Sequence, residues 1–357
     1  MKVNRHIVFI IPSLQQGGLE NSVSVLVNQL TKDNNHRISI ICFYKNSVFY
    51  KVDKSVEIIH PNFHRKGFST VQYYLKSFFF IKNTLKDIKP DVVISFGDYI
   101  NAISILTAKS LGLPVYISDR SSPGKNFPFF VNLLRNIAYP KAKGVIAQTQ
   151  RAKDQKVKMG VREDKIKVIP NPVRRISILK EPKRKIVLCV ARHYKVKGID
   201  RLFEAFANTH EKSWQLEIAG SEGPETKYLK ELAENLNISE RVTFLGARKD
   251  IDAIYSYSGI FALTSRSEGF PNALIEAMAH GLPCIAFDIN AGPADIIKHE
   301  VNGILVEDGN IGELTLQLNL LMEDTARRNE LGKRALKIMD RLSLERISED
   351  FLAFISR

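Results

Sequence analysis

Two glutamates flank a short turn in the C-terminal third of the chain. Glu268 comes directly before the turn Gly269-Phe270-Pro271-Asn272, and seven residues separate it from Glu276. An apolar segment, residues 259–264, leads into the turn as an expected strand, and a helix is expected to follow. The first amides of a helix have no intrahelical partner and lie at the positive end of its dipole. The segment therefore predicts a phosphate-binding turn with one carboxylate at its edge and another two turns along the helix.

Two cations follow another expected strand, residues 186–191. Arg192 stands at its carboxyl end, and Lys197 comes just before the next expected helix. Ligands of parallel sheets bind at the carboxyl ends of strands. The planar guanidinium and the compact ammonium both suit a diphosphate. A pair of solvent-exposed cations is the alternative interpretation, and this segment alone does not decide between them.

Paired glycines mark the loop after the first expected strand. Gly17 and Gly18 would let the backbone approach a ligand at the start of a helix. The chain lacks a Gly-x-Gly-x-x-Gly sequence here, which weakens a dinucleotide-binding interpretation. A structural role in a tight turn fits the loop equally well. A third turn, residues 219–225, also lies between a strand and a helix, and we expect it to begin the helix.

Size and composition indicate a two-domain globular protein. The chain has 357 residues, of which 44% are hydrophobic and 25% charged. It contains no apolar run of the roughly 18 residues that a membrane-spanning helix needs. The first residues, starting at Met1, run into an apolar strand without a cleavage site, so we expect no signal peptide. Three isolated cysteines in apolar runs (Cys42, Cys189 and Cys284) indicate buried, reduced thiols in a cytoplasmic protein.

Short apolar segments alternate with helical patterns along the whole chain. Many are continuous Val/Ile/Leu runs, as expected when helices cover both faces of a sheet. This rhythm predicts the α/β class with two doubly wound parallel sheets. The expected strands are residues 6–14, 37–43, 56–59, 91–96, 115–118, 145–148, 166–169, 186–191, 216–219, 242–245, 259–264, 284–287 and 304–306.

The expected domain boundary lies in a segment that is rich in proline and basic residues. Residues 170–182 contain three prolines, and the strand pattern begins again after them. We therefore expect a first domain over residues 1–175 and a second over residues 176–340. Residues 341–357 would form a C-terminal helix that packs back on the first domain.

The combination of these motifs resembles the retaining glycosyltransferases of family 4, over nearly the whole chain. The similarity rests on the Gly17-Gly18 pair, on Arg192 with Lys197, and most specifically on Glu268 and Glu276 around Gly-Phe-Pro-Asn. It implies the GT-B fold, in which two Rossmann-like domains face each other across a central cleft. It also implies that the first domain binds the acceptor and the second the nucleotide sugar.

The resemblance implies a role for each motif. Arg192 and Lys197 would neutralise the diphosphate of the donor, in place of a divalent metal ion. Glu268 would contact hydroxyls of the donor sugar, and Glu276 the ribose hydroxyls. The other implied donor-binding residues are Gly17 and Gly18 over the diphosphate, Gly269, Phe270, Pro271 and Asn272 at the phosphate and sugar, and Gly246 and Arg248 beside the nucleobase. The nucleotide diphosphate sugar, with uridine as the expected base, is a co-substrate, and no other cofactor and no metal is expected.

The chain departs from the family pattern at one position. Many relatives have a histidine after the fourth strand of the first domain, but residues 94–101 contain none. Asp98 or Asn101 could take that place, and so could Asp119-Arg120 after the following strand. Glu268, Arg192 and Lys197 are thus the expected catalytic residues, with Asp98 as a further candidate.

Charge is distributed unevenly between the two halves. Residues 1–178 contain 28 Lys+Arg and 11 Asp+Glu, a formal charge of +17, whereas residues 179–357 contain 24 and 27, a charge of −3. Residues 68–89 and 127–143 interleave aromatic and basic side chains, which is typical of helices that lie on an anionic membrane. Ordinary helices that pack on a sheet are the alternative. The basic half suits an acceptor on a lipid diphosphate and a cytoplasmic enzyme peripheral to the inner face of the plasma membrane.

These observations lead to one main functional hypothesis and two rivals. The chain would move a hexose or N-acetylhexosamine from a UDP-sugar to a growing, lipid-linked bacterial surface glycan, such as lipopolysaccharide or capsule. A GT-B sugar-nucleotide epimerase is the nearest rival. A nucleic-acid-binding protein is the other, but the positive charge is scattered and no nucleic-acid-binding motif is present. We therefore expect no nucleic-acid partner.

Overall fold

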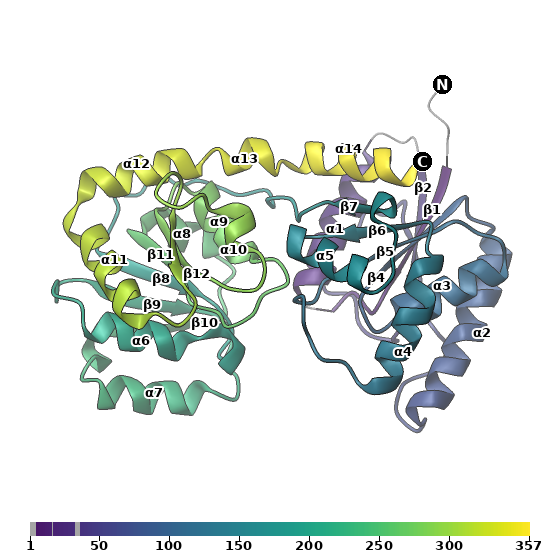
Figure 1. The fold of residues 1–357 in the computed structure, drawn as a ribbon, viewed down its shortest axis with the longest axis horizontal. Helices are drawn as coiled ribbons and strands as arrows, with labels where there is room; N and C mark the ends of the chain where they lie inside the picture. The colour runs from purple at the N-terminus through teal and green to yellow at the C-terminus, as the bar shows by residue number, and fades with distance from the viewer. Residues whose placement is uncertain (1–4, 16, 33–35) are drawn as a thin grey trace. The chain divides into compact units, whose positions relative to one another are not determined.

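The computed structural model describes residues 5–15, 17–32 and 36–357. The chain divides into two compact units (Figure 1). The first unit comprises the chain up to Pro172 together with Leu344–Arg357, and the second unit comprises Val173–Ser343. Each unit is built around a parallel sheet with helices on both faces.

A seven-stranded parallel sheet forms the centre of the first unit, in the order β3-β2-β1-β4-β5-β6-β7. Its strands are β1 (Arg5–Ile11), β2 (His36–Cys42), β3 (Glu57–Ile59), β4 (Val92–Phe96), β5 (Val115–Ser118), β6 (Gly144–Ala147) and β7 (Ile166–Val168). Its helices are α1 (Gly18–Thr31), α2 (Thr70–Ile88), α3 (Asn101–Ser110), α4 (Phe129–Ala138), α5 (Gln150–Lys158) and α14 (Leu344–Ile355).

Side chains alternate between the two faces of this sheet, so each strand contributes to two apolar layers. On one face, Val8 and Val93 pack with Ile81 of α2 and Ile105 of α3. On the other face, Phe9 and Phe96 stack with Phe351 of α14, at ring-centroid distances of 6.2 and 6.3 Å. The C-terminal helix is therefore part of the core of the first unit.

Local sequence sets the ends of the helices in this unit. Ser69 and Gln72 form a capping box that begins α2, and Lys89 ends it in a left-handed conformation. The segment expected to be helical over residues 127–143 is shorter than that: α4 ends at Ala138 and a 3₁₀ turn covers Tyr139–Lys141. Pro140 explains this difference, because proline has no backbone N–H to continue an α-helix.

The second unit contains a six-stranded parallel sheet in the order β10-β9-β8-β11-β12-β13. Its strands are β8 (Ile186–Val190), β9 (Gln215–Ala219), β10 (Val242–Gly246), β11 (Ile260–Leu263), β12 (Cys284–Asp288) and β13 (Ile304–Glu307). Its helices are α6 (Ile199–Ala207), α7 (Thr226–Asn235), α8 (Ile251–Tyr257), α9 (Asn272–Ala279), α10 (Pro293–Ile296), α11 (Ile311–Glu323), α12 (Thr325–Ala335) and α13 (Ile338–Arg341).

The sequence-based prediction of the fold class is confirmed. Each expected strand corresponds to a strand of one of the two parallel sheets. The three cysteines are buried and form no disulfide. Among the described helices, none is both long enough and apolar enough to span a bilayer.

Candidate functional site

The strands of the second sheet are all parallel, so the loops that follow β8, β9, β11 and β12 lie at the same edge of the sheet. β8 lies between β9 and β11, and β11 lies between β8 and β12. Successive strands are added on one side of β8 and then on the other, so the order reverses between β8 and β11. In open parallel sheets the ligand crevice lies at such a point, outside the carboxyl ends of the strands.

Lys197 and Glu268 meet at this edge. Lys197 ends a 3₁₀ turn, Lys195–Lys197, after β8, and Glu268 follows β11. The Lys197 ammonium donates to Glu268 Oε1 at 2.7 Å, and the Ser265 hydroxyl donates to the same oxygen at 2.6 Å. Both charged side chains are largely buried, with 23% of Lys197 and 10% of Glu268 exposed. Two residues that lie far apart in sequence thus form one charged centre.

The backbone around this ion pair is held by a close approach of the two loops. Gly198 has a φ of +62°, and a Cβ there would collide with the Thr264 carbonyl oxygen. The Thr264 hydroxyl donates to the Gly198 carbonyl at 2.8 Å. Arg266 adds a bidentate pair with Asp200 of α6, at 2.7 and 2.6 Å. These contacts fix the position of Lys197 relative to Glu268.

Arg192 is an exposed cation in the loop after β8. Its guanidinium carbon lies 5.0 Å from the ring centroid of Tyr194, and within the described chain it makes no ion pair with a carboxylate. The His193 N–H donates to the Ser221 carbonyl at 3.1 Å, so the turn after β9 packs against this loop. Arg192 is therefore available to an incoming anion at the same edge of the sheet.

The Gly269–Asn272 turn lies beside the ion pair and leads into α9. In the described structure the amides of Gly269 and Phe270 donate to no protein acceptor, and Asn272 begins the helix. Gly292, in the loop after β12, packs against Pro271 so closely that no side chain fits between them. The turn thus has the free amides and the helix N-terminus that the sequence pattern predicts for an anion site.

Glu276 occupies a buried position on α9. Its Oε1 lies 3.1 Å from Arg174 Nε, and the same guanidinium also contacts Asp252 Oδ1. Burial raises the pKa of Glu276 above its ordinary value, whereas Arg174 opposes that rise. The sequence analysis did not predict Arg174 as a site residue, because it is one of several basic residues in its segment and belongs to no motif.

Gly246 is the last residue of the edge strand β10, and Arg248 lies in the loop that follows it. The Gly220 N–H donates to the Gly246 carbonyl at 2.8 Å, so this loop neighbours the turn after β9. Arg248 forms a bidentate pair with Asp250 at 2.8 and 2.6 Å on the surface. Their expected place beside a nucleobase stays a prediction.

The glycine loop of the first unit begins α1. The Gly17 N–H donates to the Tyr50 hydroxyl at 3.2 Å, and that hydroxyl donates to the Gly17 carbonyl at 2.9 Å. The Glu20 carboxylate lies where a side chain on Gly17 would point. An anion at Gly17 and Gly18 would therefore require Glu20 to move. Gln16 of this loop and Met1 of the expected N-terminal segment lie outside the described residues.

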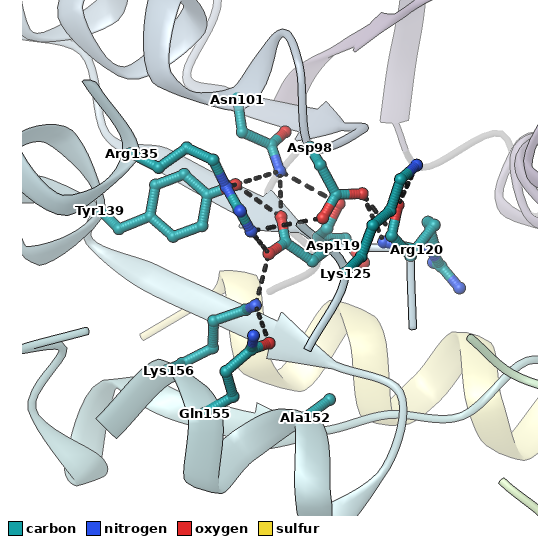
Figure 2. Close-up of polar contacts among 12 residues, drawn as sticks. Asp98, Asn101, Asp119, Arg120, Lys125, Arg135, Tyr139, Ala152, Gln155 and Lys156 are labelled. Carbon is teal, nitrogen blue, oxygen red and sulfur yellow. Dashed lines mark hydrogen bonds and ion pairs between the residues drawn. The ribbon is translucent and has the colours of Figure 1, made fainter. Parts of the chain in front are cut away.

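Asp98 belongs to a buried polar cluster at the carboxyl ends of β4 and β5 (Figure 2). Its Oδ2 accepts the backbone N–H groups of Arg120 and Ser121 at 3.3 and 3.1 Å, and its Oδ1 lies 3.4 Å from the Arg135 guanidinium. Burial raises the pKa of Asp98, and the charge of Asp119 adds to the increase.

Asp119 is the centre of the cluster in Figure 2. It accepts from Lys156 at 2.6 Å, from Tyr139 at 2.6 Å, from Asn101 at 2.8 Å and from Arg135 at 2.9 Å. Although burial opposes its charge, the Lys156 and Arg135 cations hold the pKa of Asp119 well below its usual range. Asp98, Asn101, Asp119 and Arg120, which the sequence analysis considered together, do lie together.

The predicted site residues therefore form two groups, one in each unit. Lys197 and Glu268 touch, and Arg192 and the Gly269–Asn272 turn lie on neighbouring loops. Gly17, Gly18 and Asp98 lie in the first unit. Among the described residues, no three His, Cys, Asp or Glu side chains are grouped so that they could hold a metal ion.

Comparison with known proteins identifies both units. A family model described as Glycosyltransferase Family 4 matches residues 16–175, and one described as Glycosyl transferases group 1 matches residues 172–338. Among curated proteins, the chain is 28% identical to the GalNAc-alpha-(1->4)-GalNAc-alpha-(1->3)-diNAcBac-PP-undecaprenol alpha-1,4-N-acetyl-D-galactosaminyltransferase of Campylobacter jejuni. That match covers 98% of each chain.

Solved structures of the same fold extend over nearly the whole chain. The apo form of the lipopolysaccharide outer core galactosyltransferase WaaB is 24% identical, with a TM-score of 0.79 over 98% of this chain and 99% of that one. Alr3699/HepE from Anabaena, in complex with UDP, is 20% identical, with a TM-score of 0.81 over 98% and 99%. The two parallel-sheet units, the two family models and these similarities together show that the chain belongs to the glycosyltransferases of family 4, with the GT-B fold.

Proposed function

We propose that this glycosyltransferase moves a hexose or N-acetylhexosamine from a UDP-sugar, with retention of configuration, to a growing lipid-linked bacterial surface glycan. The observation that carries this proposal is the pairing of Lys197 with Glu268 beside the free amides of Gly269 and Phe270. Together with Arg192, these groups supply positive charge and hydrogen-bond donors at a single edge of the second sheet.

The chemistry of donor cleavage calls for such an arrangement. When a nucleoside diphosphate leaves a sugar, negative charge builds on the phosphate and the sugar ring gains oxocarbenium character. Fixed cations and amide dipoles aimed at the developing charge commonly lower such a barrier by about 3 kcal/mol per donor. Lys197 and Arg192 would stabilise the leaving diphosphate, and Glu268 would orient both Lys197 and the hydroxyls of the donor sugar.

The nature of the donor and of the acceptor is inferred from two relatives. The Campylobacter enzyme is named for an acceptor on undecaprenyl diphosphate, and the Anabaena structure holds UDP. Glu276 would then bind the ribose hydroxyls, because its carboxylate lies on the helix that follows the Gly269–Asn272 turn. Gly246 and Arg248 would border the base.

Activity without a metal ion is part of the proposal. Arg192 and Lys197 would carry out the charge neutralisation that a divalent ion performs in other transferases. Turnover should therefore persist in EDTA and show no increase on addition of Mg²⁺ or Mn²⁺. Loss of activity in EDTA that either ion restores would contradict this part.

Association with the inner face of the plasma membrane is the corresponding proposal for the first unit. Its exposed aromatic side chains include Phe79 on α2 and Phe129 on α4, at 59% and 75% exposure. Lys76 and Lys82 on α2 would add attraction to anionic lipid headgroups. The excess of positive charge before residue 178 favours the same surface.

The proposed reaction can be tested in two stages. A panel of nucleotide sugars is first screened for an increase in melting temperature, and we expect UDP-sugars to give the largest shift. The best donor is then incubated with acceptors linked to undecaprenyl diphosphate, and the anomeric configuration of the product is read by NMR. Lys197→Ala serves as the inactive control.

Two outcomes would contradict the proposal. In one, no nucleotide sugar stabilises the protein. In the other, the donor alone is converted to an epimeric nucleotide sugar, which would indicate an epimerase.

A further inference from the structure

An apolar groove runs between α2, α3 and α4 of the first unit. Its volume is about 390 Å³, within the range of ligand-binding pockets. Among the described residues that line it, Asp98 alone is charged. The apolar walls include Leu75, Phe78, Ile103, Leu106, Phe130 and Leu134.

The rim of this groove leaves large apolar side chains in water. Leu75 of α2 is 56% exposed, and Phe130 of α4 is 75% exposed. A contiguous apolar surface of this kind normally marks a binding site, because burial of such side chains is favourable. The groove is therefore expected to be covered when the protein works.

One end of the groove lies beside a lysine. Asp98 and Tyr99 line this end, and the Lys125 ammonium lies 5.5 Å from the ring centroid of Tyr99. Figure 2 shows Lys125 beside Asp98, whereas the Arg120 side chain points away from it and contacts Asn171. The Asp98 carboxylate already accepts two backbone N–H groups, whereas in the described chain Lys125 pairs with no carboxylate. A ligand with an apolar chain and an anionic head would complement this arrangement.

The composition of the walls favours a hydrocarbon chain over a peptide. A peptide segment would bring backbone N–H and C=O groups into contact with walls that offer almost no hydrogen-bond partners, at a cost in free energy for each unpaired group. A hydrocarbon chain has no such groups. A concave groove also surrounds a single chain, whereas contact with a bilayer surface needs only an exposed face.

We propose that this groove binds the isoprenoid chain of the lipid-linked acceptor, with the phosphate next to that chain beside Lys125. The proposal rests on the proposed function, which supplies a lipid-linked acceptor. It assigns to the first unit a binding site for the part of the acceptor that does not react.

Direct binding of a short isoprenoid tests this proposal without the full acceptor. The purified full-length chain is titrated with farnesyl diphosphate below its critical micelle concentration, in a calorimeter at several temperatures. We expect binding with a negative heat-capacity change, because apolar surface is buried. Inorganic diphosphate should bind at least about tenfold more weakly, since it lacks the chain.

Four exposed positions provide matched variants. Leu75→Ser and Phe130→Ser alter the groove and should each weaken farnesyl diphosphate binding about tenfold. Phe79→Ser and Phe129→Ser lie on the same two helices at similar exposure but outside the groove, and should leave that affinity unchanged. For the affinity to phosphatidylglycerol vesicles we expect the opposite order, with larger losses in Phe79→Ser and Phe129→Ser than in the two groove variants.

Three results would overturn the groove assignment. The first is no binding of farnesyl diphosphate, and the second is an equal loss in all four variants, which would indicate contact with a bilayer surface. The third is unchanged affinity in both groove variants. UDP binding, measured on the same samples, separates this failure from that of the proposed function: a chain that binds UDP but not farnesyl diphosphate contradicts the groove alone.

Discussion

Among the described residues, Lys197 has one charged partner, Glu268, and an ammonium group can donate three hydrogen bonds. The remaining donors are available to a diphosphate without loss of the ion pair. Glu268 can likewise accept from Lys197 and Ser265 on one oxygen and offer the other to a sugar hydroxyl. The pair is thus able to hold both sides of the bond that breaks.

Replacement of Lys197 by alanine should lower kcat by about 10²- to 10³-fold, because one fixed donor to the developing charge is lost. Steady-state kinetics with the donor identified by the binding screen measure the effect. Lys195→Ala is the matched control, since Lys195 is an exposed lysine of the same turn and should retain nearly full activity. An active Lys197→Ala enzyme would remove this residue from the mechanism.

Glu276 gives the site a dependence on pH. Its pKa is raised by burial, so the carboxylate takes up a proton at a higher pH than an ordinary glutamate does as the solution is acidified. Donor affinity should therefore fall as the pH is lowered through this raised pKa, because a protonated carboxyl accepts ribose hydroxyls poorly.

Arg174→Met should move the midpoint of that loss to higher pH, because the guanidinium is the main group that favours the charged form of Glu276. The midpoint is obtained from UDP affinity measured by calorimetry between roughly pH 5 and pH 8, a range that lies above the ordinary pKa of a glutamate. Arg175→Met, at the neighbouring exposed position, should leave the midpoint unchanged. A shift of equal size in both variants would argue against a specific contact.

Sequence reasoning picked out residues inside short motifs, two of which the fold brings into contact, and did not find partners that only the fold supplies. Lys197 and Glu268 were identified because each lies in a compact pattern after an apolar strand. Arg174 was missed, because its segment has no regular structure and nothing local links it to Glu276. The cations around Asp119 were missed for the same reason, since Arg135 and Lys156 come from two separate helices.

At the scale of elements, the strands could be predicted because a parallel strand that is covered on both faces has a continuous run of apolar residues. The run ahead of Arg192, for example, forms β8, and the run ahead of Glu268 forms β11. The contacts between the loops could not be predicted from those runs. Gly198 appears in the sequence as an ordinary glycine, and only the neighbouring Thr264 carbonyl explains why a side chain cannot fit there.

Gly198→Ala should separate the two loops and lower both stability and activity. The left-handed backbone alone costs about 1 kcal/mol for alanine, and the collision with Thr264 adds to that cost. Gly112→Ala is the matched control, because Gly112 has a similar φ of +71° but open space around it. Urea denaturation should show the larger loss for Gly198→Ala, and only that variant should lose turnover. Equal losses of stability would mean that backbone strain alone matters.

At the scale of the whole molecule, the chain leaves the first unit at Pro172 and returns to it at Leu344. Removal of residues 344–357 should therefore destabilise the first unit, because Phe9 and Phe96 lose the ring of Phe351. Truncation of a buried phenylalanine typically costs about 3–5 kcal/mol. Hydrogen exchange should show faster exchange in β1 and β4 than in the full chain, while β8 and β11 stay protected. Uniform loss of protection in both units would contradict this division.

The return of α14 to the first sheet also bears on the order in which the protein is made. Domains generally fold as units, with the N-terminal one first as the chain leaves the ribosome. Here the first sheet is synthesised early, yet the aromatic layer over Phe9 and Phe96 waits for Phe351, which emerges after the whole of the second unit. During synthesis, the second unit can therefore complete its core while the first still exposes apolar surface. A nascent chain halted shortly before residue 344 should accordingly engage chaperones through its N-terminal half.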